Sequence, residues 1–407
     1  MTVPRVLLLT GTPPGYSGVG GVFLKELCLS YPKDSICCCA VSGNRSNAND
    51  LDWLPIEYFV RPRERGFELL GHFAQVSGLF FQQYMMLIRN PELVRHITRF
   101  GRQYDTEIVW SILNSPALIH LARKVATTLS VPLVVTVWDP PERFAIDLRM
   151  DAFSRSLLLR QFAETLRAAD RCAVASEEMH EEYKKRLGIE SVVLIHGVHP
   201  KLHRPATKQL AKSDQFIIGV AGSLHSQPVF EALISALSSV GWSLDGRDVI
   251  LRVLGSVIPI HTPSLDKVRI EYFGWRTLEE TIDIMSKVDI TYLPYWFDKH
   301  YSVAARLCFP NKLSTYLAAG KPVLFHGPED SSPAHFFNKY PVGLCCHSLE
   351  EGPIIESLKR FIKDAEFYTL AAKACQEALD KELNLNVFRQ RFAALIGIDD
   401  DELLPLD

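Results

Sequence analysis

Short apolar runs alternate with stretches of helical periodicity along most of this chain. Runs this short and this apolar are typical of buried strands, and strands alternating with helices predict an α/β fold with parallel sheets. In the first half, the predicted strands are residues 5–10, 35–41, 109–112, 133–137, 171–175 and 192–195. The predicted helices there are residues 19–30, 115–128, 153–169 and 177–187.

A polar segment with few apolar residues, 204–214, interrupts this alternation and reads as a linker. A second alternating set follows the linker, so the chain is predicted to form two α/β halves with a cleft between them. The strands predicted in the second half are residues 216–221, 250–254, 268–272, 290–293 and 323–325. The helices predicted there are residues 229–240 and 278–287, and residues 350–383 are largely helical.

Composition narrows the class of protein. The 407 residues are 47% hydrophobic and 22% charged, with a net charge of −3, so nothing draws the whole chain toward nucleic acid. No apolar run reaches the length of a membrane span, and the N-terminus lacks the layout of a secretory signal, which predicts a cytoplasmic protein. The nine cysteines include no pair spaced for zinc, so we expect core residues in a reducing compartment and no metal.

Residues 61–103 break the alternation of strands and helices. The stretch from Glu57 to Gln103 mixes aromatic and basic residues and carries seven arginines against four glutamates. Two interpretations stay open. The segment forms helices packed on the domain, or it forms an element that associates with a membrane surface.

The most informative segment is 309–324, which reads F-P-N-K-L-S-T-Y-L-A-A-G-K-P-V-L. It predicts a turn, a short helix with Pro310 in its first turn, a stop at Gly320 and a buried strand. A helix that begins here directs free N–H groups and a partial positive charge outward, and Lys312 adds a full charge. The pattern predicts an anion site. The alternative is an ordinary helix with a solvated lysine.

Two loops that follow predicted strands of the first half are further candidates for chemistry. Gly20 and Gly21 end the loop after strand 5–10, where glycines allow close approach of the backbone to a ligand. Their spacing is not that of a dinucleotide site, and a flexible surface loop is the alternative. Asp139 follows strand 133–137, at the edge of a parallel sheet where ligands bind. Its alternative role is to cap the turn that begins at Pro140.

Segment 309–324 resembles the donor-binding helix of GT-B glycosyltransferases of the retaining, family-four-like kind, in the variant F-P-x-K-L-x-x-Y-L-A-x-G-x-P-V. In that family the amino end of this helix holds the diphosphate of a nucleotide-sugar. The loop with Gly20 and Gly21 resembles the family's first loop, whose paired glycines approach the donor. The residues that the resemblance places at the diphosphate are Pro310, Asn311 and Lys312.

Other segments resemble the family with substitutions. Trp138 stands where the family has histidine in Thr-x-His-Asp, and residues 194–199 resemble Ile-x-Asn-Gly-Val-Asp. Residues 219–224 resemble the loop G-x-x-G-R-L, with Ser223 in place of an arginine that pairs with the diphosphate. Two glutamates of the family are replaced by Leu307 and Thr315, and the second of these normally holds the ribose hydroxyls.

The resemblance also implies how the missing charge is replaced and where donor contacts lie. His225, Arg306 and Lys312 would supply positive charge, and Arg276 follows a turn where the family's backbone touches the base. Tyr295 lies in an aromatic loop that contacts the sugar in the family, and packing beneath the helix is the alternative. The complete set expected to bind the donor is Gly20, Gly21, Gly222, Ser223, His225, Arg276, Tyr295, Arg306, Pro310, Asn311, Lys312 and Thr315.

The fold implied by the resemblance is GT-B, in which two Rossmann-like domains face a cleft. Residues 1–205 would form the acceptor-binding domain, residues 215–385 the nucleotide-sugar-binding domain, and residues 386–407 a segment that crosses back to the first domain. The implied activity is transfer of a sugar from a nucleotide diphosphate sugar to a hydroxyl of a glycan or lipid-linked acceptor, in glycan, glycolipid or polysaccharide assembly.

This implied reaction needs no metal and no cofactor beyond the donor. Lys312 would stabilise the leaving group, and Asp139 would act on the acceptor side. Peripheral association with the inner face of a membrane fits such an acceptor. Loss of both glutamates leaves two alternatives, namely a catalytically silent GT-B scaffolding subunit, and a sugar-nucleotide hydrolase or epimerase.

Overall fold

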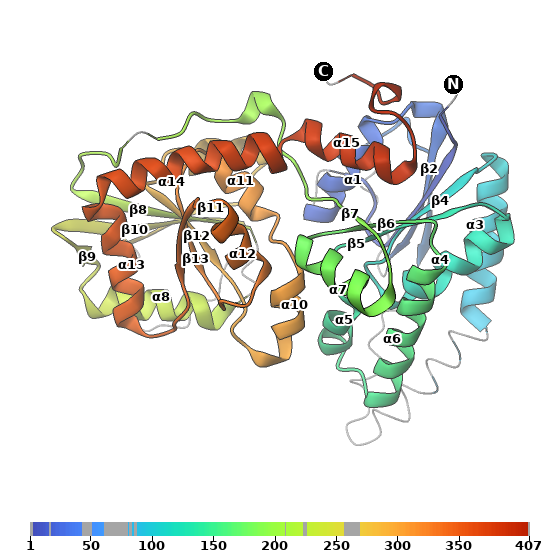
Figure 1. The fold of residues 1–407 in the computed structure, drawn as a ribbon, viewed down its shortest axis with the longest axis horizontal. Coiled ribbons are helices and arrows are strands. Elements are labelled where there is room, and N and C mark those ends of the chain that lie inside the picture. The colour runs from blue at the N-terminus through green and yellow to red at the C-terminus, as the bar shows by residue number, and fades with distance from the viewer. Residues whose placement is uncertain are drawn as a thin grey trace. The chain divides into compact units, whose positions relative to one another are not determined.

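The computed structural model describes residues 3–15, 18–42, 51–60, 80, 84, 88–207, 209–222, 226–255 and 269–405. The chain forms two compact units. The first unit comprises Met1–Leu194 with Arg389–Asp407, and the second comprises Ile195–Phe388. Each unit contains its own sheet of predominantly parallel strands with helices between them (Figure 1), which confirms the predicted α/β class.

The sheet of the first unit has the order β3-β2-β1-β4-β5-β6-β7, and every pair in it is parallel. Its strands are β1 (Val6–Thr10), β2 (Ile36–Ser42), β3 (Ile56–Val60), β4 (Ile108–Ile112), β5 (Leu133–Val137), β6 (Arg171–Val174) and β7 (Val192–Val193). The helices are α1 (Val19–Leu29), α3 (Asn90–Gln103), α4 (Pro116–Leu129), α5 (Pro141–Asp147), α6 (Ala152–Arg167) and α7 (Glu177–Leu187), and α15 (Leu385–Ile396) enters the unit from the second.

Helices cover both faces of this sheet because successive residues of a strand point to opposite sides. Leu7 of β1 faces α3, where a side chain at Gly101 would place its Cβ 3.2 Å from Leu7. Trp110 of β4 packs on the ring of Phe392 in α15, at 4.9 Å between centroids. The three cysteines of β2, Cys37 to Cys39, are buried, as predicted, and all nine cysteines are free thiols.

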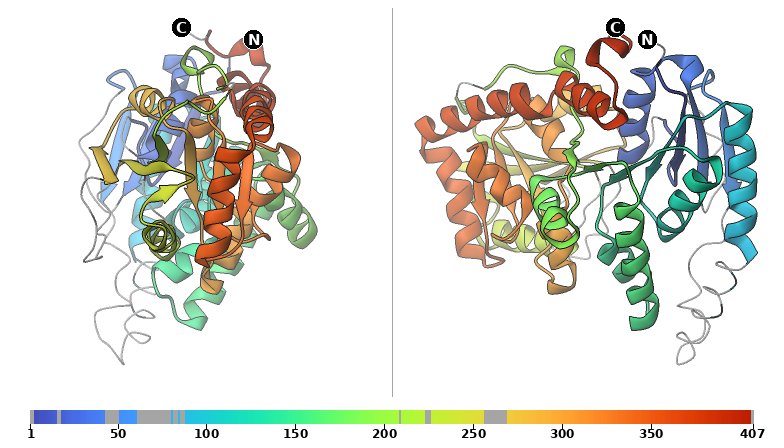
Figure 2. Two further views of the ribbon diagram at one scale, coloured as in Figure 1. Left: turned by 90° about the vertical axis from the view of Figure 1, so that its left-hand side faces the viewer. Right: turned by 45° about the vertical axis from the view of Figure 1, so that its right-hand side comes forward.

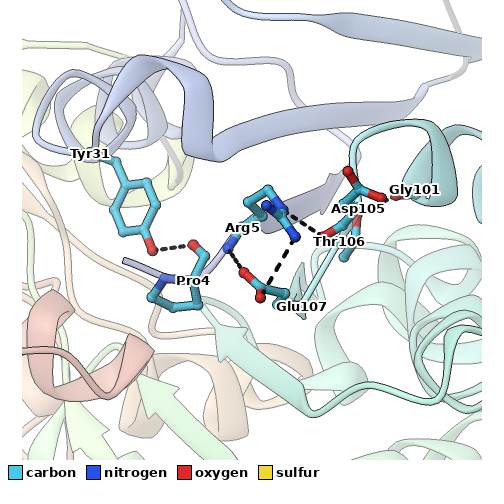
Figure 3. Close-up of polar contacts among 7 residues, drawn as sticks. All are labelled: Pro4, Arg5, Tyr31, Gly101, Asp105, Thr106 and Glu107. Carbon is cyan, nitrogen blue, oxygen red and sulfur yellow. Dashed lines mark hydrogen bonds and ion pairs between the residues drawn. The ribbon is translucent and has the colours of Figure 1, made fainter. Parts of the chain in front are cut away.

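Polar contacts hold the start of β1 at the amino edge of this sheet (Figure 3). The backbone N–H of Arg5 donates to Glu107 at 2.8 Å, and its guanidinium Nε donates to the carbonyl of Asp105 at 2.8 Å. The hydroxyl of Tyr31 donates to the carbonyl of Pro4 at 2.6 Å. These bonds lie at the edge opposite to the carboxyl edge, where open parallel sheets bind their ligands.

The sheet of the second unit has the order β11-β10-β8-β12-β13-β14, with the short β9 paired antiparallel to β10. Its strands are β8 (Gln215–Ala221), β9 (Ser243–Leu244), β10 (Arg247–Leu254), β11 (Ile270–Gly274), β12 (Ile290–Pro294), β13 (Val323–His326) and β14 (Gly343–Cys346). Its helices are α8 (Gln227–Ser239), α9 (Leu278–Met285), α10 (Ser302–Leu307), α11 (Lys312–Ala318), α12 (Ser332–Lys339), α13 (Glu351–Lys363) and α14 (Ala365–Ala378).

Alternation along β8 separates the two layers of helices in the second unit. Phe216, Ile218 and Val220 join a core cluster with residues of α8 and α13. Gly219 faces the other side, where its missing Cβ would lie 2.7 Å from the sulfur of Met285 in α9. Helices α9 and α14 both contact α11 on that side. Figure 2 shows from two further directions that helices lie on both faces of each sheet.

Backbone hydrogen bonds in the second unit join two pairs of segments that are distant in the sequence. The N–H of Arg204 donates to the carbonyl of Ala318 at 2.8 Å, so the start of the predicted linker is bonded to the end of α11. Val198 forms a parallel bridge with Asn384, and Val198 bonds to residues on both sides of it. Gly197 is needed at this bridge, because a Cβ there would lie 2.2 Å from the carbonyl oxygen of Asn384.

Candidate functional site

Three glycines lie at the ends of neighbouring strands, at the carboxyl edge of the second sheet. Gly222, Gly255 and Gly274 have φ values of +81°, +107° and +66°, which disfavour other residues. The N–H of Gly222 donates to Leu254 at 3.0 Å, and the N–H of Gly255 donates to Gly274 at 2.8 Å. Backbone without side chains therefore lines this edge beside β8, β10 and β11. Gly222 and the turn before Arg276 were predicted from the sequence, whereas Gly255 was not.

Lys312 lies against Gly222. A Cβ built on Gly222 would lie 3.1 Å from Cε of Lys312 and 3.8 Å from its Nζ. Burial of the ammonium group lowers the pKa of Lys312 to about 8. Two residues that the sequence analysis assigned to the same anion site are thus neighbours in the structure, although 90 positions separate them.

Helix α11 is shorter than the sequence predicts at its start. It begins at Lys312, whereas the sequence analysis placed Pro310 in its first turn, and it contains seven residues. The N–H of Leu313 still donates to the carbonyl of Pro310 at 2.9 Å, so a turn precedes the helix. The residue at the N-cap, Asn311, makes no side-chain cap bond within the described part of the chain. Lys312 adds a full positive charge to the partial charge of the backbone N–H groups at this end.

Tyr316, one turn after Lys312, joins α11 to the end of β8. Its hydroxyl accepts a hydrogen bond from the N–H of Ala221 at 2.8 Å and lies 3.4 Å from the carbonyl oxygen of the same residue. Both Tyr316 and Ala221 are buried. No role for Tyr316 was predicted from the sequence, because its partner is 95 residues away.

The other residues expected to bind the donor differ in their exposure to solvent. Ser223 and His225 lie outside the described residues. Pro310 is buried, while Asn311, Thr315 and Arg306 are half-buried. Leu307, which stands at the position of the family's first glutamate, is 1% exposed, so this position points into the core.

Tyr295 is buried by the protein itself. Its hydroxyl donates to the carbonyl of Cys308 at 2.8 Å, and its ring lies 4.7 Å from the ring of Trp296. This is the packing alternative of the sequence analysis, and it leaves Tyr295 little surface for a sugar. Arg276, by contrast, is exposed after Gly274, and its guanidinium donates to the carbonyl of Trp275 at 2.8 Å.

A buried histidine fixes the loop after β12. Burial lowers the pKa of His326 to about 4, so the ring is neutral at pH 7 and carries one N–H. Nε2 lies 2.7 Å from the carbonyl oxygen of Ser348 and must donate to it, so Nδ1 accepts from the hydroxyl of Tyr292 at 2.7 Å. The N–H of Tyr295 donates to the carbonyl of His326 at 2.8 Å. The sequence analysis missed this network.

In the first unit, Gly20 and Gly21 lie in the first turn of α1 rather than in the loop before it, and close packing leaves little room for side chains there. A Cβ on Gly20 would lie 2.8 Å from Cζ3 of Trp138, and a Cβ on Gly21 would lie 3.2 Å from the carbonyl oxygen of Pro13. The ring of Trp138 also meets Phe23 edge to face, with 5.1 Å between centroids. Nε1 of Trp138 is buried with no hydrogen-bond partner among the described residues.

Asp139 follows Trp138 and forms an ion pair with Arg143 on α5, at 2.5 Å between the nearest atoms. The N-cap of α5 is Pro140, so Asp139 does not occupy the N-cap that the alternative interpretation gave it. Arg143 also lies 3.5 Å from Asp147. Asp139 is therefore a half-buried carboxylate at the carboxyl edge of the first sheet, and it shares the guanidinium of Arg143 with Asp147.

Within the described ranges, no three His, Cys, Asp or Glu side chains are grouped as a metal site. None of the helices that the structure describes combines the length and apolar character needed to cross a bilayer.

Comparison with solved structures identifies the architecture as the GT-B fold. HepE from Anabaena, solved in complex with UDP and glucose, superposes with a TM-score of 0.66 at 14% identity, covering 97% of this chain and 99% of that chain. Sucrose-phosphate synthase from Thermosynechococcus elongatus gives 0.66 at 13% identity, covering 96% and 100%. WaaG, a glycosyltransferase involved in lipopolysaccharide biosynthesis, gives 0.56 at 13% identity, covering 97% and 99%.

No protein-family model matches the sequence, and no curated protein matches it significantly. The resemblance stated from the motifs is therefore confirmed at the level of the fold, over nearly the whole chain.

Proposed function

We propose that this protein is a glycosyltransferase that moves a sugar from a nucleotide diphosphate sugar to an acceptor hydroxyl. The observation that carries the proposal is the position of Lys312 against Gly222, at the carboxyl edge of a nucleotide-type sheet. The fold supports it, because proteins of the same architecture include one solved with UDP and glucose.

The chemistry assigned to the described residues is stabilisation of a leaving diphosphate. Charge builds on the diphosphate as the bond to the sugar breaks, and a preorganised cation in a desolvated site stabilises it. Lys312 supplies that cation, while Gly222 lets the phosphates approach the backbone. Arg306 is proposed as a further cation for the diphosphate, and Arg276 as a contact to the nucleotide. With this charge supplied by the protein, the proposed reaction needs no metal.

Asp139 is proposed to bind the acceptor hydroxyl in the first unit, where it is a half-buried carboxylate. The acceptor is proposed to be a glycan or lipid-linked glycan, and the outcome to be retention. Both proposals follow the motif resemblance. Trp138 adds a hydrogen-bond donor at the same edge, since its buried Nε1 has no partner among the described residues.

The test is nucleotide binding and turnover by the purified chain and two lysine variants. Lys312→Ala should weaken binding of UDP or GDP by about 1–3 kcal/mol, the scale of a charge-assisted hydrogen bond. That corresponds to about 5- to 150-fold in Kd. Lys373→Ala removes an exposed lysine of the same unit and should leave the affinity unchanged. Equal affinities for the Lys312→Ala variant and the unmodified chain would remove Lys312 from the site.

A silent scaffolding subunit is the second candidate, favoured by Leu307 and Thr315 at the two glutamate positions. A thermal shift with UDP or GDP, but no turnover with any nucleotide-sugar and acceptor tested, would support it. Release of nucleotide with water alone would instead indicate a hydrolase. Transfer to an acceptor sugar would reject both.

Association with a membrane surface is proposed for one face of α3. Arg95, Arg99 and Arg102 are exposed and share one face of α3, and Ile88 lies just before this helix. Ile88 is 58% exposed. The opposite face is buried against the domain, as the packing interpretation expected. Basic side chains next to exposed apolar ones suit anionic lipid headgroups.

Co-sedimentation with vesicles of phosphatidylglycerol and phosphatidylcholine tests this face. Replacing Arg95, Arg99 and Arg102 by glutamine should reduce binding to anionic vesicles at low salt. The matched control replaces the exposed arginines of α6, Arg155, Arg160 and Arg167, and removes the same charge. Equal binding by both triple variants, or no binding by the unmodified chain, would leave α3 with the packing role alone.

A further inference from the structure

At the end of β8, beside Lys312, the neighbouring strands do not supply all the hydrogen-bond partners of the backbone. β8 pairs with β12 only at Ile218 and Gly219, whereas on its other side it pairs with β10 as far as Ala221. The chain order makes this gap the switch point of the sheet, because β8 leads to β10 on one side and β12 lies on the other. Strands that part at a switch point leave backbone groups without a ladder partner.

Ala221 is the residue that this parting affects. Successive N–H groups of a strand point to opposite sides, and the N–H of Gly222 points toward β10, where it donates to Leu254. The N–H of Ala221 therefore points toward the side from which β12 has departed. The hydroxyl of Tyr316 accepts it there at 2.8 Å. A buried amide left without a partner is costly, so this bond ties α11 to β8.

The same helix presents Lys312 to the next residue of the strand. Lys312 and Tyr316 are four positions apart, which places them on one face of α11. Tyr316 bonds to Ala221, and the end of the Lys312 side chain packs on Gly222. Adjacent residues of β8 and its loop are thus contacted by residues one helical turn apart.

We infer that Tyr316 is a positioning residue, whose hydroxyl locks α11 to the end of β8 and so holds the Lys312 ammonium at Gly222. The inference rests on the proposed function, because the proposed function assigns diphosphate binding to Lys312. Because Tyr316 is fully buried, we expect it not to touch the ligand.

Other contacts keep α11 in place when this bond is removed. The hydroxyl of Ser314 donates to the carbonyl of His196 at 2.8 Å, and the carbonyl of Ala318 accepts from Arg204 at 2.8 Å. Leu313 and Leu317 are fully buried. Tyr316→Phe keeps the ring and loses one hydroxyl, so the variant should fold with α11 present and its amino end less constrained.

A double-mutant cycle separates positioning from general destabilisation. Isothermal titration with UDP, GDP and ADP is carried out on Tyr316→Phe, Lys312→Ala and the double variant. For the nucleotide that binds, Tyr316→Phe should weaken the affinity about tenfold, and it should have no further effect in the Lys312→Ala background. Equal weakening in both backgrounds, or none in either, would overturn the inference.

Tyr368→Phe is the matched control. Tyr368 is also fully buried in the second unit, and its hydroxyl donates to the carbonyl of Asp289 at 2.6 Å, at the amino edge of the sheet. It should lower the melting temperature as Tyr316→Phe does and leave nucleotide affinity unchanged. A loss of affinity in the Tyr368→Phe variant equal to that in Tyr316→Phe would show that lost stability is the cause, and would overturn positioning.

A measurement without ligand keeps the two proposals distinguishable. Reductive ¹³C-methylation of the lysines allows the pKa of Lys312 to be followed by NMR, with Lys312→Ala assigning the signal. Tyr316→Phe should move this pKa toward that of a free lysine, because the ammonium would leave its desolvated position, and Tyr368→Phe should not. An unchanged pKa in Tyr316→Phe would overturn positioning. Failure of the unmodified chain to bind any of the three nucleotides would instead overturn the proposed function.

Discussion

The charge of Lys312 depends on its position in the structure. A free lysine is protonated throughout the physiological range, whereas burial lowers the pKa of Lys312 to about 8. The ammonium form predominates below that pH and is lost above it. A bound diphosphate favours the charged form, so binding and protonation are coupled.

This coupling predicts a pH dependence of nucleotide affinity. The affinity for UDP or GDP should be nearly constant from about pH 7 to 8 and should fall at higher pH, by at most about tenfold per pH unit, because one proton is involved. Titration calorimetry between pH 7 and 9.5 measures it. Lys312→Ala should lose the fall, and the same slope in that variant would assign the titration to another group.

Gly20 and Trp138 are a second pair of residues in close contact. Gly20→Ala would place a Cβ 2.8 Å from the Trp138 ring, and we expect a loss of about 1–3 kcal/mol in unfolding free energy from overpacking. Trp138→Ala opens that space, so the double variant should lose less than the two single losses combined. Urea unfolding of the three variants measures the coupling. Additive losses would show that the ring does not constrain Gly20.

At the scale of elements, strong periodicity found the long helices and the buried strands. Helix α7 was predicted with its observed bounds, Glu177–Leu187, and so was β5, Leu133–Val137. Short elements were missed, among them α5, α10 and α12, which have seven, six and eight residues. A helix of two turns shows too few repeats of the apolar pattern to be recognised, and its place is set by neighbouring elements.

The bridge between Val198 and Asn384 gives a prediction at this scale. Gly197→Ala would place a Cβ 2.2 Å from the carbonyl oxygen of Asn384, and the bonds of Val198 to Leu383 and Leu385 prevent the two segments from separating freely. We expect a loss of about 2–4 kcal/mol in unfolding free energy, the range of severe packing changes.

Gly352→Ala is the control for this substitution. Gly352 lies in α13, and nothing lies within 4 Å of the Cβ that it would gain, so alanine should be neutral or stabilise by about 0.5–1 kcal/mol. Chemical denaturation of both variants gives the comparison. Similar stabilities for the two alanine variants would show that the chain segments at the bridge move apart easily.

For the whole molecule, two buried histidines predict a loss of stability in acid. Burial lowers the pKa values of His196 and His326 to about 4, while an unfolded chain has histidine pKa values near 6.5. Between these values the unfolded state takes up protons and the folded state does not. The free energy of unfolding should therefore fall as the pH drops from about 6.5 to 4, by at most about 1.4 kcal/mol per pH unit for each histidine.

Urea unfolding at pH 7, 6 and 5 measures this slope. His326→Gln should flatten it by about one proton, because the substituted side chain does not titrate. His196→Gln, at the second buried histidine, should flatten it by a similar amount. A slope in His326→Gln equal to that of the unmodified chain would contradict the assignment to His326.

The expected domain limits, residues 1–205, 215–385 and 386–407, stay predictions, as do the roles of the site residues. The architecture itself was predictable in outline, because short apolar runs that alternate with helical periodicity indicate buried strands joined by helices. The motif around Lys312 was readable for a similar reason, since a turn, a cation and a glycine stop are local features.

Only the tertiary structure decided which residues meet. Lys312 with Gly222, Tyr316 with Ala221, and Gly20 with Trp138 are pairs separated by 90 or more positions in the sequence. Local periodicity carries no information on such pairs, because their contact depends on where strands part and how closely helices approach them. The sequence by itself determined the two α/β halves and a candidate cation, and packing between distant segments determined that cation's neighbours, its desolvation and its pKa.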